Sequence, residues 1–222
     1  MIQFDNVTKT FRTPGGRKTI FRNATATFPT GRSVGLLGRN GAGKTTLMSM
    51  IGGSIRPDSG TIHKTGTVSW TVGFAGSFNR LMTGAQNTKF VARIYGVDTD
   101  ELVDFVQDFA ELGPHFHAPV HSYSSGMKSR LAFGISIGIP FDTYLVDEVT
   151  SVGDAAFKRK SGAAFLNRMK TAGAIVVTHS MAQIARLCDA GMILEDGQLT
   201  YYDDIHEAIA QHHINMGTTE DE

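Results

Sequence analysis

Cysteine is nearly absent from this chain of 222 residues, because Cys188 is the only one. A single cysteine excludes a disulfide within the chain and fits a reducing compartment. Cys188 follows Arg186 and Leu187 in a segment with a helical pattern. We therefore interpret its thiol as a buried bystander and not as a nucleophile.

Net charge and long apolar runs are also lacking. Lys plus Arg and Asp plus Glu each total 21, so no overall basic field favours nucleic acid as a partner. The most apolar window, residues 131–141, is far shorter than the ~20 residues that span a bilayer, and Pro140 interrupts it. The first residues, MIQFDNVTKTF, alternate like a strand and lack the layout of a signal peptide. We expect that the chain does not cross a membrane by itself, and attachment through a partner stays open.

Strand and helix patterns alternate along the chain and are interrupted by one helical stretch. Strands are expected at 2–11, 18–28, 33–38, 61–63, 67–74, 143–148, 174–179 and 191–196, with a tight hairpin turn at Asp196-Gly197. Helices are expected from Gly43 to about Gly52, then at 86–96, 99–113, 125–138, 154–171, 181–188 and 203–215. This order predicts an α/β core in a single domain, residues 1–216, with a helical subdomain inserted at about 84–139. Residues 217–222 are expected to form a short acidic tail.

A glycine-rich stretch, GRNGAGKTT, lies between an expected strand and an expected helix. It contains Gly38, Arg39, Asn40, Gly41, Ala42, Gly43, Lys44, Thr45 and Thr46. A glycine, four residues and then Gly-Lys-Thr form the P-loop pattern, in which backbone N–H groups surround a phosphate chain. Lys44 is expected to bridge the β- and γ-phosphates, and the Thr45 hydroxyl to hold Mg²⁺. A chance match to a plain glycine-rich turn is the alternative, and the flanking strand and helix argue against it.

Acidic and basic side chains follow two other apolar strands. In YLVDE, Asp147 ends the strand, where it could reach Mg²⁺ through water, and Glu148 could polarise an attacking water. His179 ends the run AIVVTH and could sense a γ-phosphate at the same sheet edge. An acidic pair in a solvated turn and a structural histidine are the plainer readings of each motif alone. Beside a P-loop, the catalytic reading of Glu148, His179 and Lys44 is favoured.

These motifs together resemble the ATPase subunit of ABC transporters over nearly the whole chain. GRNGAGKT is similar to the Walker A motif, YLVDE to Walker B, SVGD at 151–154 to the D-loop, and His179 to the switch histidine. The resemblance implies an ABC cassette with a P-loop (RecA-like) core, an antiparallel β subdomain and the helical insertion. It further implies that the chain hydrolyses ATP with Mg²⁺, and that Phe11 stacks on the adenine.

The stretch YSSGM stands where this family has its LSGGQ signature. The family resemblance implies that two cassettes pack head to tail, so that Ser124, Ser125 and Gly126 of one chain close on the γ-phosphate held by the other. A helix N-terminus with a serine hydroxyl suits an anion, although the turn alone is more often a simple N-cap. A homodimer is therefore expected, with ATP needed to complete both sites.

Four departures from the family pattern are visible in the sequence. Ser125 replaces a glycine, Met127 a glutamine, and Gly153 a leucine. The glutamine expected after the strand at 67–74 is missing, because Gln86 lies too far along. Since Lys44 and the other catalytic candidates remain, we expect hydrolysis to survive.

The subfamily resemblance points to export of a polysaccharide. YSSGMKSRLAFG, FRTPGGR and WTVGFAGSFNRLMTGAQNTKFVARIYG closely resemble the ATPases that export capsular polysaccharide from Gram-negative bacteria. This implies a peripheral protein on the cytoplasmic face of the inner membrane, bound to a permease and, through it, to periplasmic or outer-membrane export components. Aromatic residues between Phe74 and Phe90 lie where this family meets its permease.

Other functions remain as alternatives. Exporters of O-antigen or teichoic acid share YSSGM, a soluble ABC ATPase would act on DNA or ribosomes, and a P-loop kinase would make YSSGM a coincidence. His115, His117 and His121 fall close together, but the neighbouring prolines and the lack of an acidic or thiol partner argue against a metal site.

Overall fold

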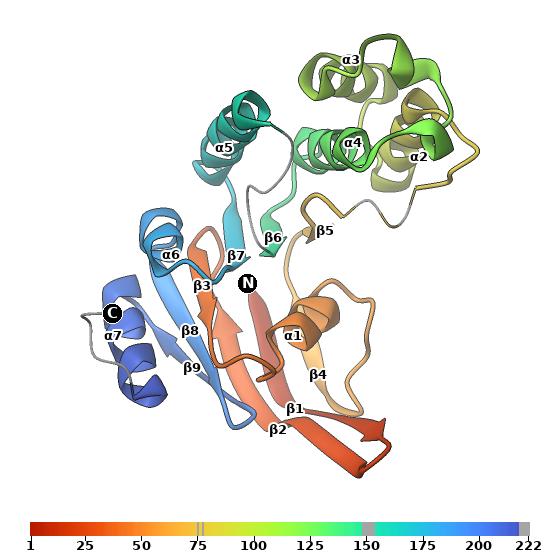
Figure 1. Ribbon diagram of the computed structural model, residues 1–222. Helices are drawn as coiled ribbons and strands as arrows, with labels where there is room; N and C mark the ends of the chain where they lie inside the picture. Colours follow the sequence, from red (N-terminus) through yellow and green to blue (C-terminus); the bar gives the residue numbers. More distant parts are fainter. Residues whose placement is uncertain (75, 77, 148–153, 218–222) are drawn as a thin grey trace. The chain divides into compact units, whose positions relative to one another are not determined.

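A computed structural model describes residues 1–74, 76, 78–147 and 154–217. The chain divides into two compact units. Unit 1 comprises residues 1–69, 141–149 and 171–222, and unit 2 comprises residues 70–140 and 150–170. Figure 1 labels the strands and helices along the chain.

An antiparallel sheet of three strands forms one part of unit 1. Its strands are β1 (Ile2–Thr13), β2 (Gly16–Phe28) and β4 (Ser59–Lys64), in the order β2-β1-β4. Ile2 and Phe4 are buried while Gln3 and Asp5 are exposed, as the two-residue period of a strand requires. The β1–β2 hairpin is longer than the sequence indicated, because pairing continues to Thr13 and Gly16.

A sheet of six strands carries the ends at which the site lies. Its order is β5 (Val68–Thr71), β6 (Thr143–Asp147), β7 (Gly173–Val177), β3 (Ser33–Leu37), β8 (Ala190–Glu195) and β9 (Gln198–Tyr202). Strands β6, β7, β3 and β8 are parallel, and β9 is antiparallel to β8. All residues of β3 and β7 are buried, which explains why these strands are continuous apolar runs in the sequence.

The expected hairpin turn after β8 is confirmed. Glu195 pairs with Gln198, so Asp196 and Gly197 form the two-residue loop. Both loop residues have positive φ, 46° and 77°, which is the conformation of a type I′ turn.

Three helices belong to unit 1: α1 (Lys44–Ile51), α6 (Met181–Leu187) and α7 (Ile205–Met216). Leu47, Met48 and Ile51 of α1 join the apolar core of the unit, in which Phe4 and Phe28 also lie. Figure 1 shows α7 alongside β8 and β9, and its Ile205 and Ala208 are buried.

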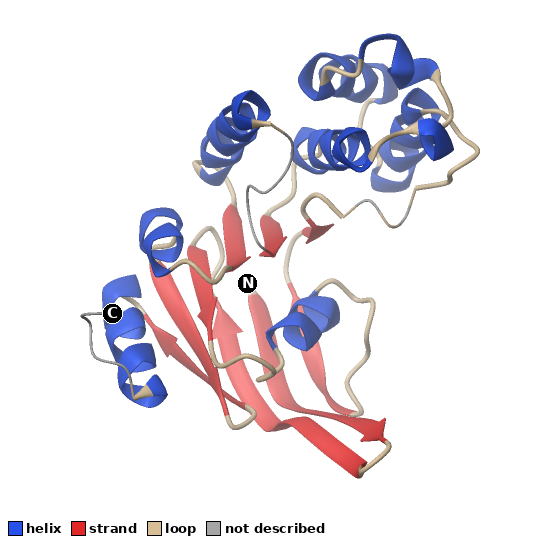
Figure 2. Ribbon diagram, viewed as in Figure 1, coloured by secondary structure: helices blue, strands red, loops and turns tan. Residues whose placement is uncertain are grey.

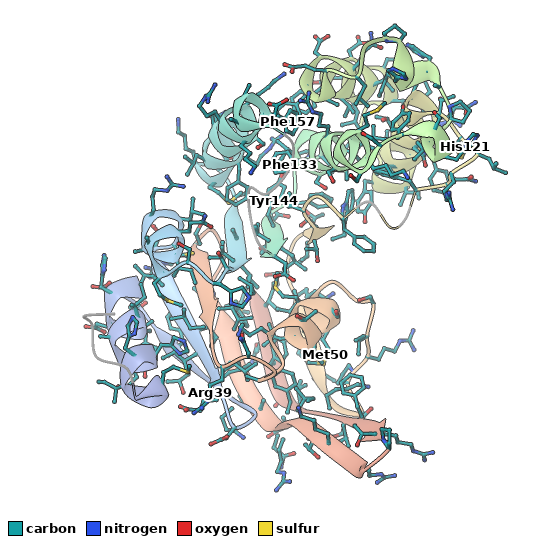
Figure 3. The ribbon with its side chains drawn as sticks, in the orientation of Figure 1. Arg39, Met50, His121, Phe133, Tyr144 and Phe157 are labelled. Atoms are coloured by element: carbon teal, nitrogen blue, oxygen red, sulfur yellow. The ribbon has the colours of Figure 1, made fainter. Side chains whose placement is uncertain are left out.

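Unit 2 is almost entirely helical, as the blue ribbons of Figure 2 show. It contains α2 (Gly84–Tyr95), α3 (Thr99–Ala110), α4 (Ser125–Gly138) and α5 (Ala155–Met169), with short 3₁₀ helices η1 (Gly113–His117) and η2 (Val120–Ser122). Its core includes an aromatic cluster in which the Phe109 ring lies 5.9 Å from Phe133 and 5.6 Å from Phe157. Phe133 and Phe157 are labelled in Figure 3.

The ends of β5 and α3 each lie three residues before the position expected. Strand β5 ends at Thr71 instead of continuing to residue 74, because Gly73 has φ 81° and Phe74 N–H turns back to the Thr71 carbonyl at 3.1 Å. Helix α3 ends at Ala110, since Glu111 adopts a left-handed conformation ahead of Gly113. The predicted division into one domain with an insertion at about 84–139 stays a prediction.

Candidate functional site

The predicted P-loop connects β3 to α1 in unit 1, and its glycines adopt conformations that other residues disfavour. Gly38, Gly41 and Gly43 have φ of 151°, 78° and 116°. A Cβ on Gly38 would lie 2.5 Å from the Leu194 carbonyl oxygen, and one on Gly43 would overlap the Ile20 side chain. The loop can therefore take its path only with glycine at these positions.

Helix α1 begins without a side-chain cap. Its N-cap residue is Gly43, which supplies no hydrogen bond to the first turn. Each of the other six α-helices in the described residues has an N-cap side chain that accepts a backbone N–H. The first turn of α1 thus keeps N–H groups and a positive dipole end available for an anion such as a phosphate.

Lys44 is held against the loop that precedes it. Its ammonium donates to the Gly38 carbonyl and, at 3.1 Å, to the Arg39 carbonyl. Burial lowers the pKa of Lys44, and the negative charge of Asp147 opposes this shift. A partly desolvated ammonium attracts a phosphate more strongly than one in open water.

Most of the predicted nucleotide residues of unit 1 line a common cavity of about 300 Å³, the nucleotide cavity, whose wall does not include Gly38, Arg39 or Ala42. The expected phosphate ligands Lys44 and Thr46, the expected Mg²⁺ ligands Thr45 and Asp147, and His179 all contribute to its walls. They come from α1, from the end of β6 and from the residues after β7. Backbone donors, an ammonium, a hydroxyl and a carboxylate in one cavity form a donor set that fits a triphosphate with Mg²⁺.

A neighbouring cavity of about 400 Å³ is lined by Lys18, by the loop residues Arg39 to Ala42, and by the β8–β9 turn. Arg39 is exposed, and its position is labelled in Figure 3. Phe11 lies on β1 opposite Lys18, with its ring 5.3 Å from the Lys9 ammonium, and it is not part of either cavity wall. Its role against adenine stays a prediction.

The signature turn, Ser124–Gly126, lies in unit 2 at the start of α4. Ser124 is the N-cap, and its Oγ accepts the Met127 N–H at 3.2 Å. The Ser124 hydroxyl keeps its own proton for donation, because it is the acceptor in this bond. Ser125, Gly126 and Arg130 line a cavity of about 640 Å³, so the turn is accessible to a ligand.

A network of charged side chains joins α4 to its neighbouring helices. Arg130 contacts Asp154 at 2.6 Å and Glu111 at 3.6 Å, and Glu111 also contacts Lys160 at 2.5 Å. The guanidinium lies 4.6 Å from the centre of the Phe157 ring. Asp154 is the N-cap of α5, and the Phe157 N–H that it accepts lowers its pKa, with the Arg130 charge acting in the same direction. This network joins α3, α4 and α5 within unit 2.

The remaining predictions concern Glu148, the predicted D-loop and Gln86. The expected general base Glu148, and residues 151–153 of the predicted D-loop, lie outside the described residues. Gln86 is part of a capping box on α2, where its side chain accepts the Thr83 N–H at 2.9 Å. Gln86 is thus bound to its own helix, in agreement with the expectation that it does not replace the missing loop glutamine.

Two residues near these sites were not singled out from the sequence. Arg130 directly precedes the apolar second half of α4, a position that could have drawn attention to it. His212 on α7 is buried and faces the P-loop region, but nothing in its local sequence indicates this. Cys188 is buried as expected, and burial raises its pKa to about 12.

The described part of the chain contains no helix that is long and apolar enough to cross a bilayer. Among the same residues, no group of three His, Cys, Asp or Glu side chains is placed to hold a metal ion.

The chain is similar to known proteins along nearly its whole length. The chain is 46% identical to "Polysialic acid transport ATP-binding protein KpsT" of Escherichia coli, over 96% of each chain. It is 40% identical to "Capsule polysaccharide export ATP-binding protein CtrD" of Neisseria meningitidis, over 94% of this chain and 96% of that protein. The solved "Structure of ATP binding subunit of ABC transporter" superposes with a TM-score of 0.79 at 20% identity, over 98% of this chain and 100% of that chain.

This structural likeness confirms the predicted α/β cassette fold. The family model described as "ABC transporter" matches residues 21–151, which include the P-loop and the signature turn. The chain therefore belongs to the ABC transporter family, as one of its ATP-binding cassettes.

Proposed function

We propose that this cassette binds and hydrolyses ATP with Mg²⁺ and thereby powers the export of a lipid-linked capsular polysaccharide. The observation that carries the proposal is the cavity in which Lys44, Thr45, Asp147 and His179 meet. They lie at the carboxyl ends of parallel strands, where α/β proteins bind their ligands.

Each residue has a distinct part in the proposed hydrolysis. The loop amides and Lys44 bind the β- and γ-phosphates, and Thr45 and Asp147 hold Mg²⁺, which neutralises charge on the phosphates. Glu148 accepts a proton from the attacking water, and His179 donates to the γ-phosphate and orients it. Lys44 stabilises the charge that develops as the bond between the β- and γ-phosphates breaks.

The signature turn of a second copy completes the site in this proposal. Ser124 has a free hydroxyl proton, and the first turn of α4 supplies a positive dipole end. The cavity beside the turn is accessible to a nucleotide that is bound to the P-loop of the other copy. ATP then closes a homodimer and its hydrolysis opens it, which is a population shift that a permease can follow.

The cargo is assigned from whole-length similarity to relatives whose names state polysaccharide transport. A place on the cytoplasmic face of the inner membrane follows from the same assignment, through a permease that spans the membrane. Periplasmic and outer-membrane components would be reached through that permease.

The permease contact is proposed on exposed apolar side chains of unit 2. Leu81 is 81% exposed, and Phe90 and Ile94 of α2 are 55% and 59% exposed. Phe90 and Ile94 are four residues apart and share one face of the helix. Exposed apolar side chains grouped in this way mark interaction sites more often than isolated ones do.

Replacing Phe90 with Glu tests this proposal in cells that depend on the chain for capsule export. We expect co-purification with an integral membrane protein and surface polysaccharide to be lost, while the purified variant binds ATP normally. Leu166→Glu is the matched control, because Leu166 lies on α5 of the same unit and is 45% exposed.

The proposed coupling of hydrolysis to export is tested in a strain that carries Glu148→Gln. Surface polysaccharide at the parental level in this strain would contradict the coupling.

A further inference from the structure

A second cavity adjoins the nucleotide cavity in unit 1 and has no assigned role. Its volume is about 400 Å³, and α7 contributes His212 and Met216 to its wall. We call it the α7 cavity. It shares Asn40, Lys44 and His179 with the nucleotide cavity, so the two spaces meet at these three residues.

The polar wall of the α7 cavity carries two cationic side chains, Arg39 and Lys44, and the imidazoles of His179 and His212. Among the described residues, no Asp or Glu contributes to this wall. Thr178 and Asn40 add polar groups, and the remaining wall residues are glycine or apolar. Such a wall fits a small anion and disfavours a neutral or cationic ligand.

His212 is the buried member of this set. Its side chain comes from the last turns of α7, and the residue is 8% exposed. Within the described residues, no hydrogen bond satisfies its imidazole. Burial lowers the pKa of His212, and the positive charges of His213 and Lys44 act in the same direction. The unpaired imidazole nitrogens are not among the fully buried atoms of the described residues, so they reach the α7 cavity and are available to a ligand there.

Helix α7 is fixed in position, so His212 is held at the wall. Asn215 Nδ2 donates to Glu195 on β8, and Gln211 donates to Asn215 Oδ1 at 2.7 Å. Asp204 caps the helix by accepting the His206 N–H at 2.7 Å. The bond from Asn215 to Glu195, and that from the Ile205 N–H to the Asp189 carbonyl at 3.2 Å, join the two ends of α7 to the rest of unit 1.

We propose that the α7 cavity binds the inorganic phosphate that hydrolysis releases. This inference rests on the proposed ATP hydrolysis. The γ-phosphate lies next to Lys44 and His179 in the nucleotide cavity, and the same two side chains line the α7 cavity. After cleavage, the phosphate moves past them and accepts a hydrogen bond from the His212 imidazole, while ADP keeps its place on the P-loop.

The test is a calorimetric titration of inorganic phosphate into the full chain saturated with Mg²⁺ and ADP. The parental protein is expected to bind phosphate. His212→Gln is expected to weaken this binding about tenfold, the size of one charge-assisted hydrogen bond, with unchanged ADP affinity. His213→Gln, the neighbouring control outside the cavity wall, is expected to bind phosphate like the parent.

A second pair of variants leaves the buried histidine intact. Met216→Glu places a negative charge in the wall and is expected to weaken phosphate binding at least about fivefold, through like-charge repulsion. Ile214→Glu places the same charge at a residue that is 70% exposed and outside the wall, and it is expected to have no effect. This pair tests whether phosphate binds in the α7 cavity even if His212→Gln does not fold.

Three results would overturn the inference. The first is that the parental chain with ADP binds no phosphate, and the second is that His212→Gln and Met216→Glu bind it like the parent. The third is that these variants change ATP-driven dimerisation while phosphate binding is unaltered, which would assign the cavity to a second copy. ATP turnover, measured separately, tests the proposed function, so phosphate binding without turnover would refute the function and leave the site.

Discussion

At the scale of single residues, Lys44 shows how the loop prepares a cation for a phosphate chain. Two loop carbonyls, those of Gly38 and Arg39, hold its ammonium beside the exposed first turn of α1. Partial burial removes water from this charge, as its lowered pKa indicates. The fixed position and the desolvation both favour binding of a negatively charged ligand.

Lys44→Ala is expected to lower the affinity for ATP by about 30- to 150-fold, because contacts from a charged donor contribute about 2 to 3 kcal/mol. The affinity is measured by calorimetry with Mg²⁺ present. Lys170→Ala removes an exposed lysine far from the P-loop in sequence and serves as the control. An unchanged affinity in Lys44→Ala would contradict the assignment of the site.

Local sequence predicted the residues of the P-loop but not the contribution of His212 to the α7 cavity. Glycine spacing, Lys44 and Thr45 form a pattern that is complete within nine residues, from 38 to 46. His212 is separated from Lys44 by most of the chain, and only the packing of α7 brings it to the same wall. Arg130 and Asp154 likewise meet through tertiary structure, which hydrophobic periodicity does not specify.

At the scale of elements, helix starts are determined by their caps. Asp98 caps α3, where its side chain accepts the Asp100 and Glu101 N–H groups. Apolar runs and turn residues located the helices and strands within a few residues. They failed where a single residue changes direction, as Gly73 does after β5 and Glu111 does after α3.

The capping box of α2 gives a prediction at this scale. Thr83→Ala removes the hydroxyl that accepts the Gln86 N–H at 3.1 Å, and it is expected to cost about 1 kcal/mol of unfolding free energy. Urea denaturation measures this loss. Thr99→Ala, one residue beyond the cap of α3, is the matched control and is expected to cost only a few tenths of a kcal/mol. Equal losses in the two variants would contradict the capping account.

At the scale of the whole molecule, the two halves of the proposed site lie in different units. The P-loop, Asp147 and His179 belong to unit 1, and the signature turn belongs to unit 2. In the proposed dimer, unit 2 of a second copy supplies the turn that covers ATP on unit 1. In the proposed dimer Gly126 faces the nucleotide, and a side chain there is expected to occupy space that the nucleotide needs.

Gly126 also allows the contact to be blocked without disturbing the chain itself. The nearest atom to a Cβ built on Gly126 is Ser124 Oγ at 3.9 Å, so a larger residue fits within its own chain. Glutamate in the first turn of a helix is compatible with the helix dipole. Gly126→Glu should therefore fold and bind ATP through its own P-loop.

Sedimentation velocity with saturating ATP and Mg²⁺ tests the central claim most directly. Two proteins are compared: the single variant Glu148→Gln, and the double variant that also carries Gly126→Glu. Glu148→Gln is expected to slow hydrolysis, so that bound ATP persists during the run. The account predicts a dimer for the single variant and a monomer for the double variant, with equal amounts of ATP bound per chain. A double variant that dimerises with ATP as fully as the single variant would show that the signature turn does not cover the nucleotide of a second copy.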